Sequence, residues 1–109
     1  MMGRQLTLSD INMKAAGGKP IVYRSEDYDS LTSGSMQTIT LNTISNSITL
    51  HNRCAYSTNN TILFYLNGVT NTPVTLQPGE DLAILKAWTF EITVQPSVDN
   101  PVWQIIVTL

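Results

Sequence analysis

The sequence has few charged residues, and those that it has are dispersed. Charged side chains make up 13% of the 109 residues, whereas soluble domains usually contain roughly 25%. The net charge is −2. The basic residues form no run: they are Arg4, Lys14, Lys19, Arg24, Arg53 and Lys86. Without a basic cluster the chain lacks the electrostatic signature of a nucleic-acid-binding protein, so we expect no DNA or RNA partner.

Cysteine and long apolar runs are scarce as well. Cys54 is the only cysteine, which excludes an internal disulfide. No window holds the eighteen or so apolar residues of a membrane span, and Met1–Gln5 lacks the apolar core of a signal peptide. We therefore expect no membrane partner, and we expect the protein to stay in a cytoplasm unless an assembly carries it out.

The polar surface must come from threonine, serine and asparagine, which are abundant. This composition suits strands and turns more than helices. At 109 residues the chain has the size of a single domain, large enough for its own apolar core.

The clearest fold signal lies between Asn59 and Leu85. Side chains alternate along a strand, so Ile62, Phe64 and Leu66 are predicted to share one face. Asn67-Gly68 then supplies two residues that readily take positive φ, as a type I′ hairpin turn requires.

The same alternation returns after this turn. Val74 and Leu76 predict a second strand, and Gln77–Glu80 (QPGE) predicts a second tight turn. Leu82 and Ile84 then resume the buried face. The stretch is therefore predicted to be a three-stranded meander.

The N-terminal third follows no sustained pattern. A short helix is predicted over Asn12–Ala16 and a short strand over Pro20–Tyr23. Residues 24–35 are rich in turn formers and are predicted to form a surface loop. We therefore divide the single domain into an N-terminal arm and loop, residues 1–36, and a β-sandwich core, residues 37–109.

Two alternating segments begin this core. Thr38–Asn42 and Ser47–His51 are separated by a short polar link around Ser45-Asn46. This pattern predicts a hairpin with one solvent-exposed face and one buried face.

Two further strands complete the core, each headed by a tryptophan on the dry face. The predicted buried residues are Trp88, Phe90, Ile92 and Val94 in the first, and Trp103, Ile105, Val107 and Leu109 in the second. The whole chain then contains roughly seven or eight strands, at the turn spacing typical of sandwiches and jelly rolls. We predict an all-β, antiparallel β-sandwich, either immunoglobulin-like or jelly-roll, with an irregular N-terminal arm.

His51 and Cys54 have a spacing that suits two metal ligands or a Cys–His catalytic pair. A structural zinc site needs four protein ligands, and the sequence has no second Cys or His. A catalytic pair would also need a cleft and an oxyanion stabiliser, which no motif indicates. We therefore predict that His51 faces outward from a strand and that Cys54 packs as a small apolar residue.

Three carboxylates, Glu26, Asp27 and Asp29, lie close together in the surface loop. Such residues suit a hard cation, but the Asp-x-Asp-x-Asp-Gly pattern of a calcium loop is missing, so a solvated acidic loop is favoured. The sequence thus predicts no catalytic residue, no metal ligand and no cofactor, and a protein that is not an enzyme.

Most aromatic residues are accounted for by predicted core positions. Tyr56 and Tyr65 are the two that are predicted to be exposed. Exposed aromatic rings beside Asn and Thr side chains are what a sugar-binding surface uses, so these two tyrosines form a possible ligand face.

The turn motifs also carry a family resemblance. The run Ile62–Gly68 (ILFYLNG), followed by Val74–Glu80 (VTLQPGE), resembles the hairpins of small β-sandwich virion proteins of tailed bacteriophages, of the head-decoration, head-fibre or tail-accessory type. The resemblance covers about a quarter of the chain. It implies an oligomeric, non-enzymatic structural protein of a virion, and it carries no individual functional residue.

The leading hypothesis is therefore a structural virion component that docks on a symmetric capsid or tail assembly. Its expected partners are copies of itself and other virion proteins. Apolar residues of the arm are too many to leave in water, so the arm is predicted to pack across a subunit interface. The predicted interface residues are Leu6, Leu8, Ile11 and Met13.

Two other classes of function remain as alternatives. The first is a carbohydrate- or receptor-binding module that uses Tyr56 and Tyr65. The second is a small enzyme, for which the test is whether His51 and Cys54 share a pocket.

Overall fold

The computed structural model describes residues 20–108, apart from the side chains of Asn42, Thr43 and Ala87. These residues form six strands and two short 3-10 helices. The elements are β1 (Ile21–Arg24), η1 (Ser25–Asp27), β2 (Gln37–Asn52), η2 (Tyr56–Thr58), β3 (Ile62–Leu66), β4 (Val74–Leu76), β5 (Asp81–Pro96) and β6 (Trp103–Thr108). The helix predicted over residues 12–16 lies outside this range.

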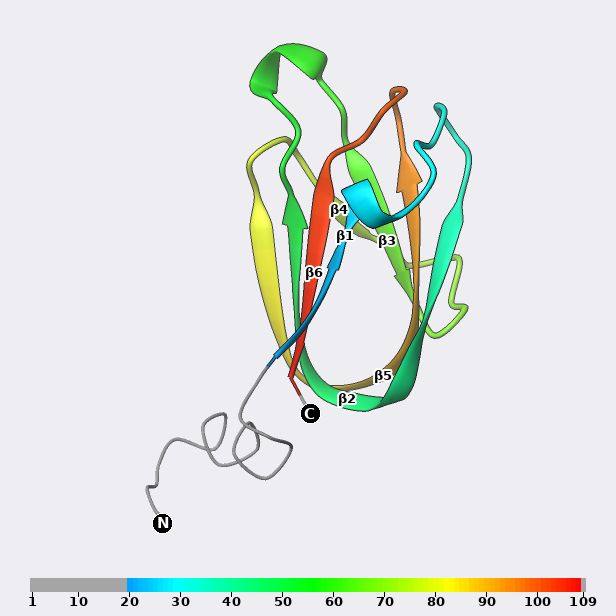
Figure 1. Cartoon of the computed structure of the whole chain (residues 1–109), viewed down its shortest axis with the longest axis vertical. Helices are drawn as coiled ribbons and strands as arrows, with labels where there is room; N and C mark the ends of the chain where they lie inside the picture. Colours follow the sequence, from blue (N-terminus) through cyan, green and yellow to red (C-terminus); the bar gives the residue numbers. More distant parts are fainter. Residues whose placement is uncertain (1–19, 109) are drawn as a thin grey trace.

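All of these strands belong to one antiparallel sheet with the order β1-β6-β2-β5-β3-β4. The sheet folds over on itself because β2 and β5, each 16 residues long, curve together round one end of the molecule (Figure 1). The second half of β2 and the first half of β5 lie in one layer with β1 and β6. Their other halves lie in the second layer with β3 and β4. Counted by halves, the structure has eight strand segments, and the predicted antiparallel β-sandwich is confirmed.

The hairpin predicted around Ser45-Asn46 is wrong. Both of its predicted strands belong to β2, which continues through the link without reversing. The first part of β2 pairs with the second half of β5, and the last part pairs with both β5 and β6. The polar link therefore marks a bend that carries the chain from one layer to the other, which we call the bend end of the sandwich.

The predicted meander is confirmed only in its first half. Asn67 and Gly68 have φ values of 54° and 76°, and the Val69 N–H donates to the Leu66 carbonyl, as in a type I′ turn. β3 and β4 pair as expected. After the second turn, however, β5 starts beside β2 in the other layer, and only its second half returns to β3.

The division of the chain at residue 36 does not match the structure. β1 is an edge strand of the sheet, with Ile21 opposite Val107, which confirms the short strand predicted near Pro20. The following loop is also tied to the sandwich: the Gly34 N–H donates to the Pro96 carbonyl, and the Asn100 N–H donates to the Leu31 carbonyl. Residues 20–36 are therefore part of the sandwich, because main-chain hydrogen bonds join them to β6, to the end of β5 and to the loop that follows β5.

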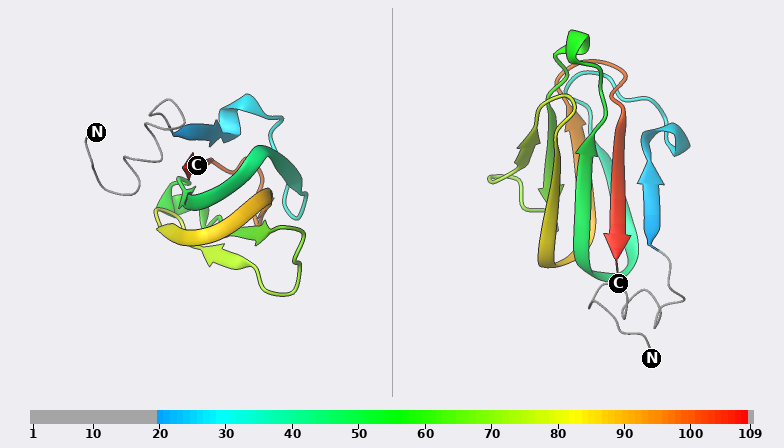
Figure 2. Two further views of the ribbon diagram at one scale, coloured as in Figure 1. Left: turned by 90° about the horizontal axis from the view of Figure 1, so that it is seen from below. Right: turned by 90° about the vertical axis from the view of Figure 1, so that its left-hand side faces the viewer.

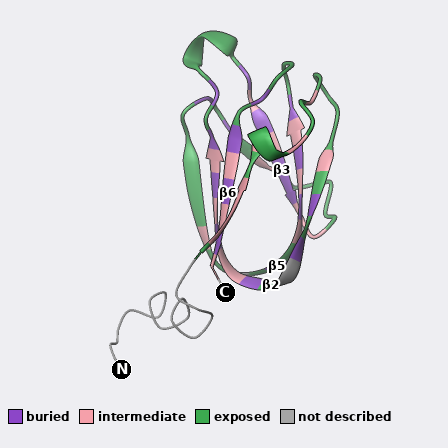
Figure 3. Ribbon diagram, in the orientation of Figure 1, coloured by how far each residue is buried: buried purple, intermediate pink, exposed green. Residues whose placement is uncertain are grey.

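The apolar core lies between the two layers, and along the strands buried residues alternate with intermediate or exposed ones (Figure 3). Alternation at period two explains this pattern, since every second residue of a strand points inward. The buried core residues are Ile39, Leu41, Ile48, Leu50, Cys54, Ile62, Phe64, Leu76, Ile92, Val94, Trp103, Ile105 and Val107. The dry face predicted for Trp103, Ile105 and Val107 is confirmed.

Two buried asparagines close the end opposite the bend, which we call the loop end. The Asn52 amide donates to the carbonyls of Asn60 and Leu76, each at 2.8 Å. The side-chain oxygen of Asn60 accepts the N–H groups of Ser97 and Val98, at 3.1 and 3.0 Å. Because both amides are satisfied, they hold these loops together without the penalty of unpaired buried polar groups.

Candidate functional site

His51 and Cys54 do not form a site together. Leu50 and Asn52 are buried on either side of His51, so His51 points to the outer face, as predicted. There its Nδ1 lies 3.4 Å from the Asp81 carboxylate. Cys54 belongs to the core, also as predicted, and its sulfur accepts the Val102 N–H at 3.3 Å. A nucleophile buried in the core and a base on the outer face of β2 cannot share a proton.

The acidic loop lies beside a hollow of about 330 Å³ between residues 25–31 and 100–103. Glu26 and Asp29 line it, above the ring of Tyr28, which packs on Trp103 with ring centroids 5.5 Å apart. Burial raises the pKa of Tyr28, and the nearby Tyr23 and Asp27 raise it further. Among the described residues, no three His, Cys, Asp or Glu side chains are arranged to hold a metal ion.

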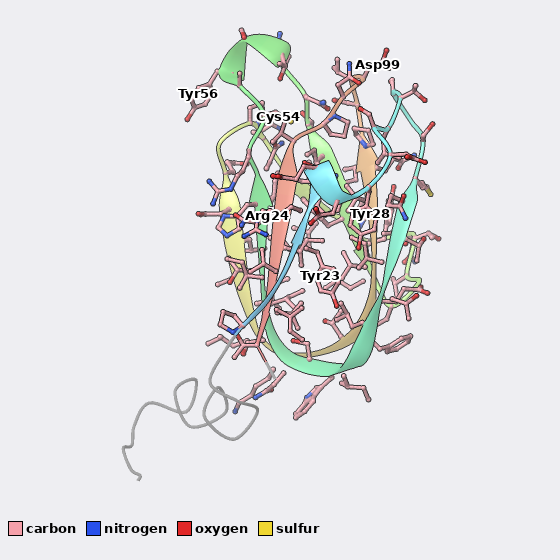
Figure 4. All side chains as sticks on the ribbon, viewed as in Figure 1. Tyr23, Arg24, Tyr28, Cys54, Tyr56 and Asp99 are labelled. Carbon is pink, nitrogen blue, oxygen red and sulfur yellow. The ribbon has the colours of Figure 1, made fainter. Side chains whose placement is uncertain are left out.

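The two tyrosines of the possible ligand face, Tyr56 and Tyr65, differ in solvent exposure. Tyr56 is 80% exposed and projects from η2 at the loop end (Figure 4). Its hydroxyl packs over Gly79, where an added Cβ would lie 2.8 Å from that oxygen. Tyr65 is only 7% exposed, and its hydroxyl donates to the Gln95 side chain at 2.6 Å. The prediction that Tyr65 is exposed is wrong, because its ring lies against the sheet and its hydroxyl is paired there.

The interface residues predicted in the arm, Leu6, Leu8, Ile11 and Met13, lie outside the described residues. The described part of the chain presents a different apolar surface at the bend end. Large side chains project there from the curve of β2 and β5: Ile44 is 58% exposed, Leu85 75%, Trp88 63% and Phe90 48%. We call these four residues the end patch.

The register of the two strands explains why these side chains gather. Ser45 of β2 pairs with Thr89 of β5, and both are fully buried. Their neighbours Ile44, Trp88 and Phe90 must therefore face outward, since adjacent side chains point to opposite faces. Figure 2, in the view from below, shows the two strands running side by side round this end.

Irregular pairing between β2 and β5 at the bend explains why the side chains of Trp88 and Phe90 point outward and not into the core. The register between β2 and β5 shifts on both sides of Ser45. Lys86 and Trp88 have φ values of 56° and 45°, in the left-handed region that side chains other than glycine rarely adopt. Extra residues in one strand of a pair twist the strand and redirect its side chains. Trp88 and Phe90, predicted to be buried, are turned outward in this way.

Asn67 fixes the outward conformation of β5. Its side-chain oxygen accepts the N–H groups of both Phe90 and Glu91, at 2.9 and 3.3 Å. Its amide group donates to the Trp88 carbonyl at 3.3 Å. The Asn67 side chain thus makes hydrogen bonds to three consecutive peptide groups of the segment that carries Trp88 and Phe90. The end patch is held in place by hydrogen bonds, so its aromatic rings need little ordering when a partner binds.

Sequence reasoning missed the end patch because the alternation from Trp88 to Val94 continues without a break. Two signals in the sequence point to it in retrospect. Leu85 is apolar but out of phase with Leu82 and Ile84. The stretch from Leu82 to Gln95 also contains no Gly, Pro, Asn, Asp or Ser, although it is far longer than an ordinary strand of about 5–6 residues.

Comparison of the chain with protein-family models, with curated proteins and with solved structures gave no match. Within residues 20–108, no helix has the length and apolar character required to cross a membrane.

Proposed function

We propose that this protein is a non-enzymatic structural component that docks on a larger symmetric assembly through its end patch. The single observation that supports the proposal most is the group of two aromatic and two aliphatic side chains exposed at the bend. Contiguous exposed apolar groups mark interaction surfaces, and aromatic anchors contribute most of the binding energy in protein interfaces.

The assembly that we propose is a bacteriophage capsid or tail, with the virion as the location of the protein. This part of the proposal is supported by the resemblance of the two turn motifs to small virion proteins. A non-enzymatic role is supported by the separation of His51, on the outer face of β2, from Cys54, which lies in the core. The carbohydrate-binding alternative loses one of its two residues, because Tyr65 is buried.

The proposal is tested with a double variant, Trp88→Ser with Phe90→Ser, and a matched control, Tyr56→Ser. The control removes an even more exposed aromatic ring at the opposite end of the sandwich. Light scattering over a range of protein concentrations measures self-association, and co-sedimentation with virions of the encoding phage measures docking.

We expect the wild type and the Tyr56 control to associate and dock, and the double variant to do neither. A wild-type protein that stays monomeric at high concentration and does not sediment with virions would overturn the proposal. A glycan array that binds the wild type but not the Tyr56 variant would favour carbohydrate recognition instead.

A further inference from the structure

The start of β1 lies at the same end of the sandwich as the end patch. One row of paired residues crosses four strands: Ile21 pairs with Val107, Val107 with Ile48, and Ile48 with Ile84. Three steps of about 4.8 Å separate the ends of such a row by about 14 Å. Leu85 directly follows Ile84 at the bend, so residues 1–19 join the described chain beside the end patch (Figure 1).

The composition of residues 1–19 complements an aromatic surface. The segment contains Leu6, Leu8 and Ile11, and it holds three of the four methionines of the chain, at positions 1, 2 and 13. Methionine is unbranched and polarisable, and it packs well on the rings of residues such as Trp and Phe.

The charges of the two parts of the chain are complementary as well. Residues 1–19 carry three basic residues and one acidic residue, a net charge of +2. Residues 20–109 carry three basic and seven acidic residues, a net charge of −4. These opposite net charges favour encounter between the segment and a sandwich, whereas the like charges of two sandwiches disfavour direct contact between them.

We infer that residues 1–19 of one copy bind the end patch of a second copy, so that two copies facing each other at their bend ends exchange these segments. The inference rests on the proposed function and deepens it: the contact that the end patch makes is with another copy of this chain, whereas a segment bound to the patch of its own chain would join no two copies. Pro20 is the seventh residue after Met13, which gives a reach of about 23 Å. A two-fold arrangement then fills both patches with the same contact made twice.

The test uses two full-length variants. The patch variant carries Trp88→Ser and Phe90→Ser, and the segment variant carries Leu8→Ser, Ile11→Ser and Met13→Ser. Each variant is expected to raise the dimer dissociation constant by about 100-fold or more, measured by sedimentation equilibrium, because each removes apolar anchors from both contacts. The Tyr56→Ser protein, altered at the far end, serves as the control and is expected to dimerise like the wild type.

Mixing the two variants separates exchange between copies from contact within one chain. The segment variant retains an intact patch, and the patch variant retains an intact segment. If segments are exchanged, the mixture forms a heterodimer with one of the two contacts, and dimer reappears although neither variant dimerises alone. Contact within one chain predicts no dimer in the mixture, and that result would overturn the inference.

The remaining outcomes distinguish the inference from the proposed function. If only the patch variant loses dimerisation, the patch is a docking surface for something other than residues 1–19, and the inference fails while the proposed function stands. If the wild type is monomeric and does not bind virions, and the patch variant behaves identically, both fail.

Discussion

The chain contains two phenylalanines and two tryptophans, and the structure places one of each in two opposite environments. Phe64 and Trp103 are buried between the layers, while Phe90 and Trp88 are 48% and 63% exposed at the bend. In the body of the sandwich the interior is apolar and the outward positions are largely polar. At the bend the order is reversed, with the small polar Ser45 and Thr89 inside and the large apolar residues outside.

The difference follows from what each stretch of strand packs against. In the body, each layer faces the other across the core, so that large side chains have a surface to fill. At the bend, β2 and β5 themselves join the two layers, and only small groups fit on the concave side. There the Ser45 hydroxyl lies 2.7 and 3.0 Å from the carbonyl oxygens of Ser47 and Thr108. The same residue type is therefore structural in one region and available for binding in the other.

The largest effect is expected from one substitution made in both regions. Phe64→Ala removes a fully buried ring and is expected to lower the free energy of unfolding by about 3–5 kcal/mol. Phe90→Ala is expected to change it by less than about 1 kcal/mol, because the ring already contacts solvent. Urea denaturation of both variants measures the two changes, and equal losses would contradict the distinction between the regions.

The crowded interior of the bend is tested by enlarging Ser45. Ser45→Leu places a large side chain where Ser45 is fully buried, and overpacking is expected to lower the free energy of unfolding by about 2–3 kcal/mol. Ser45→Ala, the control, loses only the hydroxyl hydrogen bonds and is expected to lose about 1 kcal/mol. A leucine variant as stable as the wild type would mean that the bend has room inside and that crowding does not exclude large side chains from it.

Asn67→Gly tests how firmly the end patch is held. Glycine tolerates the φ of 54° at this position, so the variant removes the side-chain bonds without adding backbone strain. We expect a loss of about 1 kcal/mol in unfolding free energy. In a Trp103→Phe background, the fluorescence anisotropy of Trp88 should also fall.

The matched control for this experiment is Asn67→Asp. It keeps an oxygen that can accept the N–H groups of Phe90 and Glu91, and should therefore retain the anisotropy. An unchanged anisotropy in the glycine variant would show that other contacts position Trp88.

The smallest expected effect is a change in the stability of the body of the sandwich at alkaline pH. Burial raises the pKa of Tyr28 above its ordinary value of 10.0, so folding favours the neutral phenol that packs on Trp103. This stabilisation is complete below pH 10.0 and is lost as the pH rises through the higher pKa of the folded protein. Tyr28→Phe should therefore lose less stability than the wild type between neutral and strongly alkaline pH, as measured by urea denaturation. Parallel losses in both proteins would contradict this role.

Local chemistry made much of the fold predictable. Asn67-Gly68 indicated a type I′ turn because those residues tolerate positive φ, and the alternation from Trp103 to Val107 indicated a strand with one buried face. These features depend only on neighbouring residues. The outward placement of His51 and the burial of Cys54 were predicted for the same reason.

The bend and the end patch were not predictable in this way. Ser45-Asn46 has the polar character of a hairpin link, and only pairing with distant Thr89 and Leu85 makes it a continuous bend. Trp88 and Phe90 fit a buried alternation, and their exposure depends on a register shift and on the bonds from Asn67. Such features arise from tertiary contacts between strands far apart in sequence, which a local pattern does not encode.

The sharing of β2 and β5 between the two layers also bears on the order of folding. Each layer contains one half of the β2–β5 ladder, which joins Thr49 to Ala83 in one layer and Gln37 to Val94 in the other. Neither layer is complete until these distant segments have met, so chain closure between them is expected to limit the folding rate. Because β2 and β5 run through both layers, the sandwich is expected to fold and unfold as one cooperative unit.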